Sequence, residues 1–205
     1  MTALIHKITI YPIKSFDGVD IESCEVLPSG GLQHDRRFAF KDADGQLFNA
    51  KNYIQIHRFE TEFQENWHDI VLSDRQQSKR ERFDLRTDQQ HLLQWMRQIE
   101  PLIDALEDNP EGGLPDDQDA SGPTIISTAT LEMVASWFDN MTIDDIRRRL
   151  RPNIEVGGVP AFWEDKLVHR QRPFRIGEVS FIGTGYCPRC VVPTRDPDSG
   201  QSLTA

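Results

Sequence analysis

Residues 4–13 carry the sequence LIHKITIYPI, in which apolar and polar side chains alternate and β-branched residues are frequent. This pattern is typical of a half-buried β-strand, and Pro12 indicates the turn at its end. Similar alternation follows at residues 19–27, and residues 36–50 predict two strands joined by an Asp-Gly hairpin. We therefore expect the amino-terminal part of the chain to be mainly sheet.

The alternation of apolar and polar residues predicts a further strand pair at residues 67–72 and 81–85. Apolar residues then recur at helical spacing over residues 88–106. Residues 107–123 combine Pro, Gly and acidic side chains without periodicity, so we expect a linker or loop there.

The remainder alternates between strands and helices. Residues 124–138 predict a short strand that runs into a helix, with Ser127 or Thr128 as its N-cap. A second helix is expected to stop before Pro152, and residues 174–182 have strand character.

These elements predict an α+β fold that is mostly β. We expect a β-rich amino-terminal domain at residues 1–106, the acidic linker at residues 107–123, and a second domain at residues 124–205.

Composition excludes several classes of protein. The chain has 205 residues, 38% of them hydrophobic, and a net charge of −10, so nucleic acid would be repelled. We find neither a long apolar run nor a signal-peptide pattern, and we expect no membrane partner and a cytoplasmic location.

Two of the three cysteines, Cys187 and Cys190, lie close together after a Gly-rich turn. A zinc site would need four ligands, and no second cysteine pair is present. A thioredoxin-like dithiol would begin a helix, whereas residues 191–193 predict a strand. Two buried cysteines packed as small apolar residues are a further alternative.

Cationic residues lie beside these thiols in the sequence or follow the ends of other predicted elements: Arg189, Arg195, Arg151 and Lys14. An adjacent guanidinium favours the thiolate, which ligates metals, and arginine also binds phosphate oxygens. Each arginine alone is better explained as a solvated surface charge. The whole set favours a thiolate site next to an anion site.

Four motifs occur in order: YPIKS at 11–15, DRRF at 35–38, LRPN at 150–153, and CPRC with TRDPDSG within 187–200. Together they resemble the MOSC family with its amino-terminal β-barrel partner. The resemblance is nearest to the branch of the mitochondrial amidoxime-reducing component and of bacterial reductases of N-hydroxylated bases. It implies a β-barrel MOSC domain packed with the amino-terminal β-rich domain.

The resemblance also implies a molybdenum–molybdopterin cofactor, with Cys190 as the metal ligand and a catalytic group. It implies that Asp196 is a second catalytic candidate, although a role in the local turn is the simpler explanation. The residues implied to bind the cofactor, besides Cys190, are Lys14, Ser15, Arg36, Ser127, Thr128, Arg151, Asn153, Pro188 and Arg189. Binding of pyridoxal phosphate is a further expectation at the level of the family.

The implied activity is reduction of an N-hydroxylated small molecule. Because no further cysteine cluster is present, electrons must come from a separate donor, ferredoxin-like or cytochrome b5-like. The resemblance also implies more strands after residue 200, so we expect a short carboxy-terminal domain with an open edge that favours a homodimer. The alternatives are a cofactor or sulfur carrier without turnover, and an interaction domain without cofactor.

Overall fold

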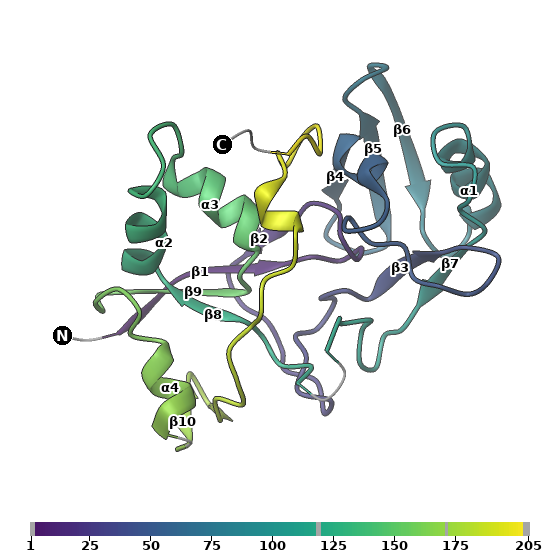
Figure 1. Ribbon diagram of the computed structural model, residues 1–205. Helices are drawn as coiled ribbons and strands as arrows, with labels where there is room; N and C mark the ends of the chain where they lie inside the picture. Colours follow the sequence, from purple (N-terminus) through teal and green to yellow (C-terminus); the bar gives the residue numbers. More distant parts are fainter. Residues whose placement is uncertain (1–2, 118–119, 171, 203–205) are drawn as a thin grey trace.

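A computed structural model describes residues 3–117, 120–170 and 172–202 (Figure 1). As expected, the described chain is rich in β-structure with short helices between the strands. Its strands form four separate sheets, and within the described residues none of them closes into a barrel. The largest sheet is open at both edge strands, so the β-rich character is confirmed and the β-barrel form of the MOSC domain stays a prediction.

That sheet has the order β2-β1-β9-β8, in which β1 is antiparallel to both neighbours and β8 is parallel to β9. Its strands are β1 (Leu4–Ile10), β2 (Val19–Ile21), β8 (Ile125–Ser127) and β9 (Ile154–Gly157). The sheet thus combines strands from both sides of the predicted acidic linker. The predicted division into two domains stays a prediction, but β1 belongs structurally with the carboxy-terminal strands.

The amino-terminal half adds one two-stranded and one three-stranded sheet (Figure 1). They consist of β3 (Phe38–Lys41) with β7 (Ala105–Asp108), and of β4 (Phe59–Phe63), β5 (Asp69–Asp74) and β6 (Lys79–Asp84). A short 3₁₀ helix, η1 (Ile54–Arg58), precedes β4. Aromatic and aliphatic side chains from these strands and from α1 (Gln89–Arg97) form the larger hydrophobic core.

The helix expected over residues 88–106 is shorter than predicted and ends at Arg97. Pro101 has no amide hydrogen, and its ring would clash with the carbonyl of Arg97 in a continued helix. The chain turns instead, and residues 105–108 form β7, which pairs with β3.

The acidic segment is more ordered than its composition predicts. The Asn109 side chain donates to the Gly113 carbonyl, and the Leu114 amide donates to the Arg36 carbonyl. Gly113 is buried with φ +67°, and a Cβ there would lie 2.6 Å from the Asp35 carbonyl oxygen. Only glycine fits this close approach, so the loop packs against the DRRF segment.

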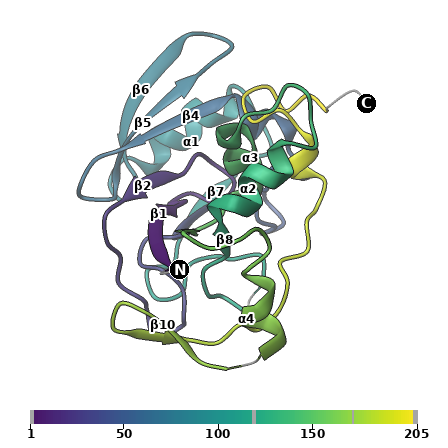
Figure 2. The same ribbon diagram turned by 90° about the vertical axis from the view of Figure 1, so that its left-hand side faces the viewer.

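The carboxy-terminal half has a second, smaller core beneath α2 (Thr128–Ala135) and α3 (Ile143–Leu150), which pack side by side (Figure 2). Ser127 is the N-cap of α2, as predicted, because its Oγ accepts from the Thr130 amide. α3 ends at Leu150, and Arg151 follows in the left-handed conformation with φ 52°. The predicted stop before Pro152 is confirmed.

The chain then continues through α4 (Asp165–Arg170), β10 (Phe174–Ile176), β11 (Val179–Phe181) and the 3₁₀ helix η2 (Val192–Thr194). One expectation is confirmed here and one is corrected. The strand character predicted for residues 174–182 is present as a hairpin, in which β10 and β11 pair on either side of Gly177 (φ +57°), a turn that glycine tolerates. The strand expected at 191–193 is largely η2, whose first turn tolerates Pro193 since its amide is not needed there.

Asn153 joins the two halves of the molecule. Its Nδ2 donates to the Thr9 carbonyl and to Asp35 Oδ1, both at 3.1 Å. Its Oδ1 accepts from the Thr124 amide and hydroxyl, both at 3.2 Å. Asp35 Oδ1 also accepts from the Tyr11 amide at 2.8 Å. The motifs YPIKS, DRRF and LRPN therefore meet at one buried set of hydrogen bonds.

We expect Asn153→Ala to lower the free energy of unfolding by about 1–3 kcal/mol, because it leaves buried hydrogen-bonding groups without partners. Denaturant unfolding of the wild type and the variant measures this change. Asn140→Ala is the matched control, since Asn140 is exposed and should change stability by no more than about 0.5 kcal/mol. Equal losses in both variants would contradict the proposed role of Asn153.

Candidate functional site

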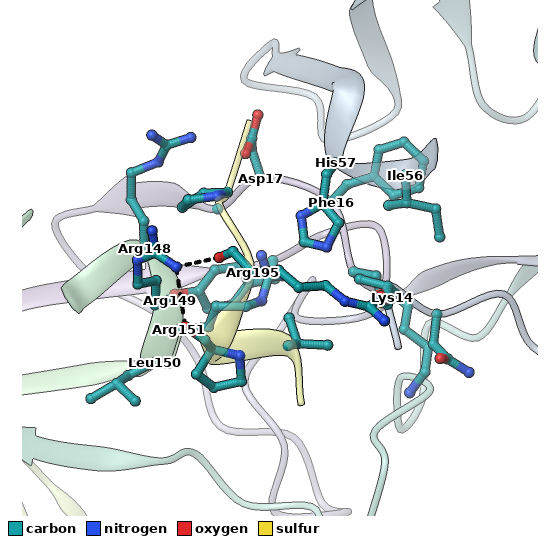
Figure 3. Close-up of a pocket in the computed structure, with 18 of the residues that line it drawn as sticks. Lys14, Phe16, Asp17, Ile56, His57, Arg148, Arg149, Leu150, Arg151 and Arg195 are labelled. Atoms are coloured by element: carbon teal, nitrogen blue, oxygen red, sulfur yellow. Dashed lines mark hydrogen bonds between the residues drawn. The ribbon is translucent and has the colours of Figure 1, made fainter. Parts of the chain in front are cut away.

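A cavity of about 960 Å³ lies where the two halves meet (Figure 3). Its walls come from the YPIKS segment, from η1, from the end of α3 and from the CPRC segment. Of the described residues that line it, eleven are lysine or arginine and six are aspartate or glutamate. Cationic side chains therefore outnumber anionic ones in this cavity although the whole chain has a net charge of −10, and this excess favours an anionic ligand.

Tyr11 organises two of these cations. The guanidinium carbons of Arg151 and Arg36 lie 4.0 and 5.2 Å from the centre of its ring, close enough for cation–π attraction. The Tyr11 hydroxyl donates to the Pro152 carbonyl at 3.1 Å. Burial raises the pKa of Tyr11 to about 12, so the phenol stays protonated near neutral pH and keeps this hydrogen bond.

Arg151 has no carboxylate in direct contact among the described residues. Its guanidinium makes neither an ion pair nor a hydrogen bond there, and it lies against the Tyr11 ring with Asp17 and Asp35 acting on it from longer range. Burial, assisted by the neighbouring Arg36 cation, lowers its pKa. A desolvated cation without a counter-ion is unfavourable, so this position favours a bound anion.

Arg189 and Arg195 also lack a carboxylate partner among the described residues. Arg189 donates to the Leu150 carbonyl at 2.9 Å, and Arg195 donates to the Ala50 carbonyl. In Figure 3, Arg195 is labelled between Arg151, at the end of α3, and Lys14. These carbonyl contacts hold the two side chains in place and leave their charges available to a ligand.

Lys14, Ser15 and Arg36 line the same cavity, and their role in binding a cofactor stays a prediction. Lys14 is buried, and its Nζ donates to the Leu114 carbonyl at 2.9 Å. Ser15 Oγ accepts from the Ala50 amide, and Arg36 is paired with Asp35. All three therefore reach the cavity with part of their hydrogen-bonding capacity already used by the protein.

Cys187 and Cys190 are both exposed and both line the cavity, together with Pro188. The alternative of two buried cysteines packed as small apolar residues is therefore wrong. Cys190 Sγ accepts a long hydrogen bond from the Val192 amide, 3.5 Å away. An exposed thiol next to unpaired guanidinium groups can ligate a soft metal ion as the thiolate.

Zinc binding by these cysteines receives no support from the geometry. Among the residues that the structure describes, the one cluster with metal-ligand spacing is His68, Asp69 and Asp84, which contains no cysteine. Its members already contact Arg82 and Arg86. This cluster is explained by ion pairs at the β5–β6 sheet.

Four predicted site residues do not line the cavity: Ser127, Thr128, Asn153 and Asp196. The Thr128 hydroxyl donates to Glu155 at 2.8 Å, and Ser127 caps its own helix. Asp196 Oδ1 accepts from the backbone amides of Asp198 and Ser199 and from the Ser199 hydroxyl, as expected of a turn residue. Their predicted functional roles stay predictions, since each side chain has a local structural role.

Other residues of the cavity were not predicted from the sequence. Arg148 makes a bidentate ion pair with Asp198, which also contacts Arg75 from the amino-terminal half. His57 lies beside these groups, and burial lowers its pKa. The periodicity of α3 could have singled out Arg148, but no local pattern marks Arg75 or His57.

Comparisons with known proteins cover nearly the whole chain. The model of the MOSC N-terminal beta barrel domain matches residues 2–109, and that of the MOSC domain matches residues 119–204. Mitochondrial amidoxime reducing component 2 of Macaca fascicularis is 26% identical over 240 residues, covering 96% of this chain and 68% of that protein. The Homo sapiens protein of that name has the same identity and coverage. The Bos taurus protein is 24% identical, covering 96% and 67%.

These comparisons bear on two further expectations. The relatives are named as mitochondrial, so a cytoplasmic location for this chain stays a prediction. They give no support to pyridoxal phosphate binding. In the described parts of the chain, every helix is too short or too polar to traverse a lipid bilayer.

We expect the three thiols to differ in reactivity. Cys24 is half-buried, and burial raises its pKa, so less of it is thiolate at a given pH. With a thiol reagent at pH 8, Cys187→Ala/Cys190→Ala protein should react roughly tenfold more slowly than Cys24→Ala protein. Equal rates in folded protein would contradict the exposed position of the cysteine pair, and denatured samples provide the control.

Proposed function

This chain belongs to the MOSC family, and on that premise we propose that it is a molybdenum-cofactor-dependent reductase of N-hydroxylated small molecules. The proposal assigns Cys190 as the metal ligand and a separate protein as the electron donor. The relatives' printed name, amidoxime reducing component, supports the reaction class.

One observation carries the proposal. The exposed Cys190 thiol lines the same cavity as Arg151, Arg189 and Arg195, none of which has a carboxylate partner among the described residues. A soft thiolate beside several unpaired guanidinium groups fits a metal held by a phosphorylated organic ligand. The set of donor groups is thus suited to a molybdenum–molybdopterin cofactor.

Each group has a task in this proposal. Cys190 would bind the metal through its sulfur, and Arg189, held by the Leu150 carbonyl, adds positive charge to the same cavity. Arg151 and Arg195 hold the phosphate through forked N–H groups, which match its oxygens better than lysine does. Tyr11 keeps Arg151 oriented through its ring face, so this arginine needs little rearrangement on binding.

The bound cofactor would supply the two-electron reduction that breaks the N–O bond. Overall, the substrate takes up two electrons and two protons and gives the N–H product and water. The electrons come from the donor, for which a ferredoxin-like or a cytochrome b5-like protein is our hypothesis. The cavity reaches the surface at the exposed CPRC segment, where water can supply protons. A homodimer stays a prediction.

Metal and pterin content tests the proposal. In a host that makes the cofactor, we expect near-stoichiometric molybdenum and pterin in the wild type. Cys190→Ser should lower bound molybdenum by roughly tenfold or more, since even groups that only orient a ligand alter metal affinity about 10- to 100-fold. Elemental analysis and the fluorescence of the oxidised pterin measure both contents.

Cys187→Ser is the matched control and should retain the metal, because it changes the neighbouring exposed thiol in the same way. Loaded wild type should then be reoxidised by an amidoxime after reduction. Loading without reoxidation would favour the carrier alternative, and wild type without molybdenum would contradict the proposal.

A further inference from the structure

One carboxylate lies directly on the cations of the cavity. Asp116 Oδ1 is 2.6 Å from Lys14 Nζ, and both residues line the cavity. Although the side chain is largely exposed, desolvation beside the cavity would raise the pKa of Asp116, but Lys14, Arg36 and Arg151 together hold it below its ordinary value. Asp116 is therefore ionised near neutral pH and experiences the same positive potential that an anionic ligand would.

Lys14 cannot turn away from this position. Its side chain is only 6% exposed, its amide donates to the Phe38 carbonyl at 2.8 Å, and its Nζ donates to the Leu114 carbonyl at 2.9 Å. An ammonium group has three N–H donors, so it can still donate to one anionic group besides that carbonyl. In this structure Asp116 occupies that place.

Asp116, in contrast, is surrounded mostly by solvent. Its side chain is 89% exposed, and it lies two residues beyond Leu114, whose amide donates to the Arg36 carbonyl of the DRRF segment. If Asp116 left, its carboxylate would be solvated at little cost. Lys14 would remain as a buried cation that needs a new counter-ion.

We propose that Asp116 is an internal competitor for anions in this cavity: its carboxylate occupies the position of a ligand's anionic group on Lys14, and the ligand must displace it. The acidic loop thereby lowers the affinity of the cavity for phosphate-bearing ligands. This inference requires that the cavity bind an anion, and it does not depend on the reductase activity.

The affinity of the isolated protein for inorganic pyrophosphate tests the inference, measured by titration calorimetry at fixed ionic strength. Asp116→Asn keeps the shape of the side chain and removes its charge. We expect roughly three- to tenfold tighter binding than in the wild type, because the competing charge is gone. Glu111→Gln is the matched control in the same acidic loop, and it should change the affinity less than about twofold.

A double variant tests whether the gain in affinity depends on Lys14. In Lys14→Met/Asp116→Asn protein the gain in affinity should disappear, because the cation for which the two anions compete is missing. Unchanged or weaker binding in Asp116→Asn would overturn the inference and leave the ion pair as a structural contact of the loop. Failure of every variant to bind pyrophosphate would overturn it as well. Neither result depends on molybdenum loading, so it is distinguishable from failure of the proposed function.

Discussion

The hydrogen bonds around Asp35 and Asn153 are the constraint on which the rest of the site depends. Asp35 accepts from the Tyr11 amide and from the Asn153 side chain, and Asn153 in turn binds Thr9 and Thr124. Three segments far apart in the sequence thereby meet at one buried point. Because such groups are costly to leave unpaired, the segments have one relative position, and the cavity opens beside it.

The cations of this cavity fall into two groups, those with a carboxylate partner and those without one. Arg36, Arg147 and Arg148 are paired with carboxylates, so they stabilise the walls. Arg151 and Arg195 have no such partner among the described residues, so their charge remains for a ligand. The acidic surface of the molecule does not cancel this local potential, because pairing at short distance decides it more than net charge does.

Much of the fold and part of the site could be predicted from local patterns. Alternation identified β1 and the β5–β6 hairpin, capping residues identified the start of α2, and Pro152 identified the end of α3. Composition predicted a loop for the acidic segment but not its contacts with the DRRF segment, which are not visible in the sequence of the loop itself. The helical spacing of apolar residues also predicted that α1 continues past Arg97. That spacing takes no account of Pro101, which prevents the helix from continuing.

The sequence by itself determined the types of chemical group available: a thiol pair, several arginines and four ordered motifs that resemble one family. Only the tertiary structure decided which of these groups share a cavity. It brought Cys190, Arg151 and Lys14 together and left Ser127, Thr128 and Asn153 in structural roles. The physical reason is that a cavity is made by pairing of distant strands and by buried hydrogen bonds, and these contacts leave no local pattern in the sequence.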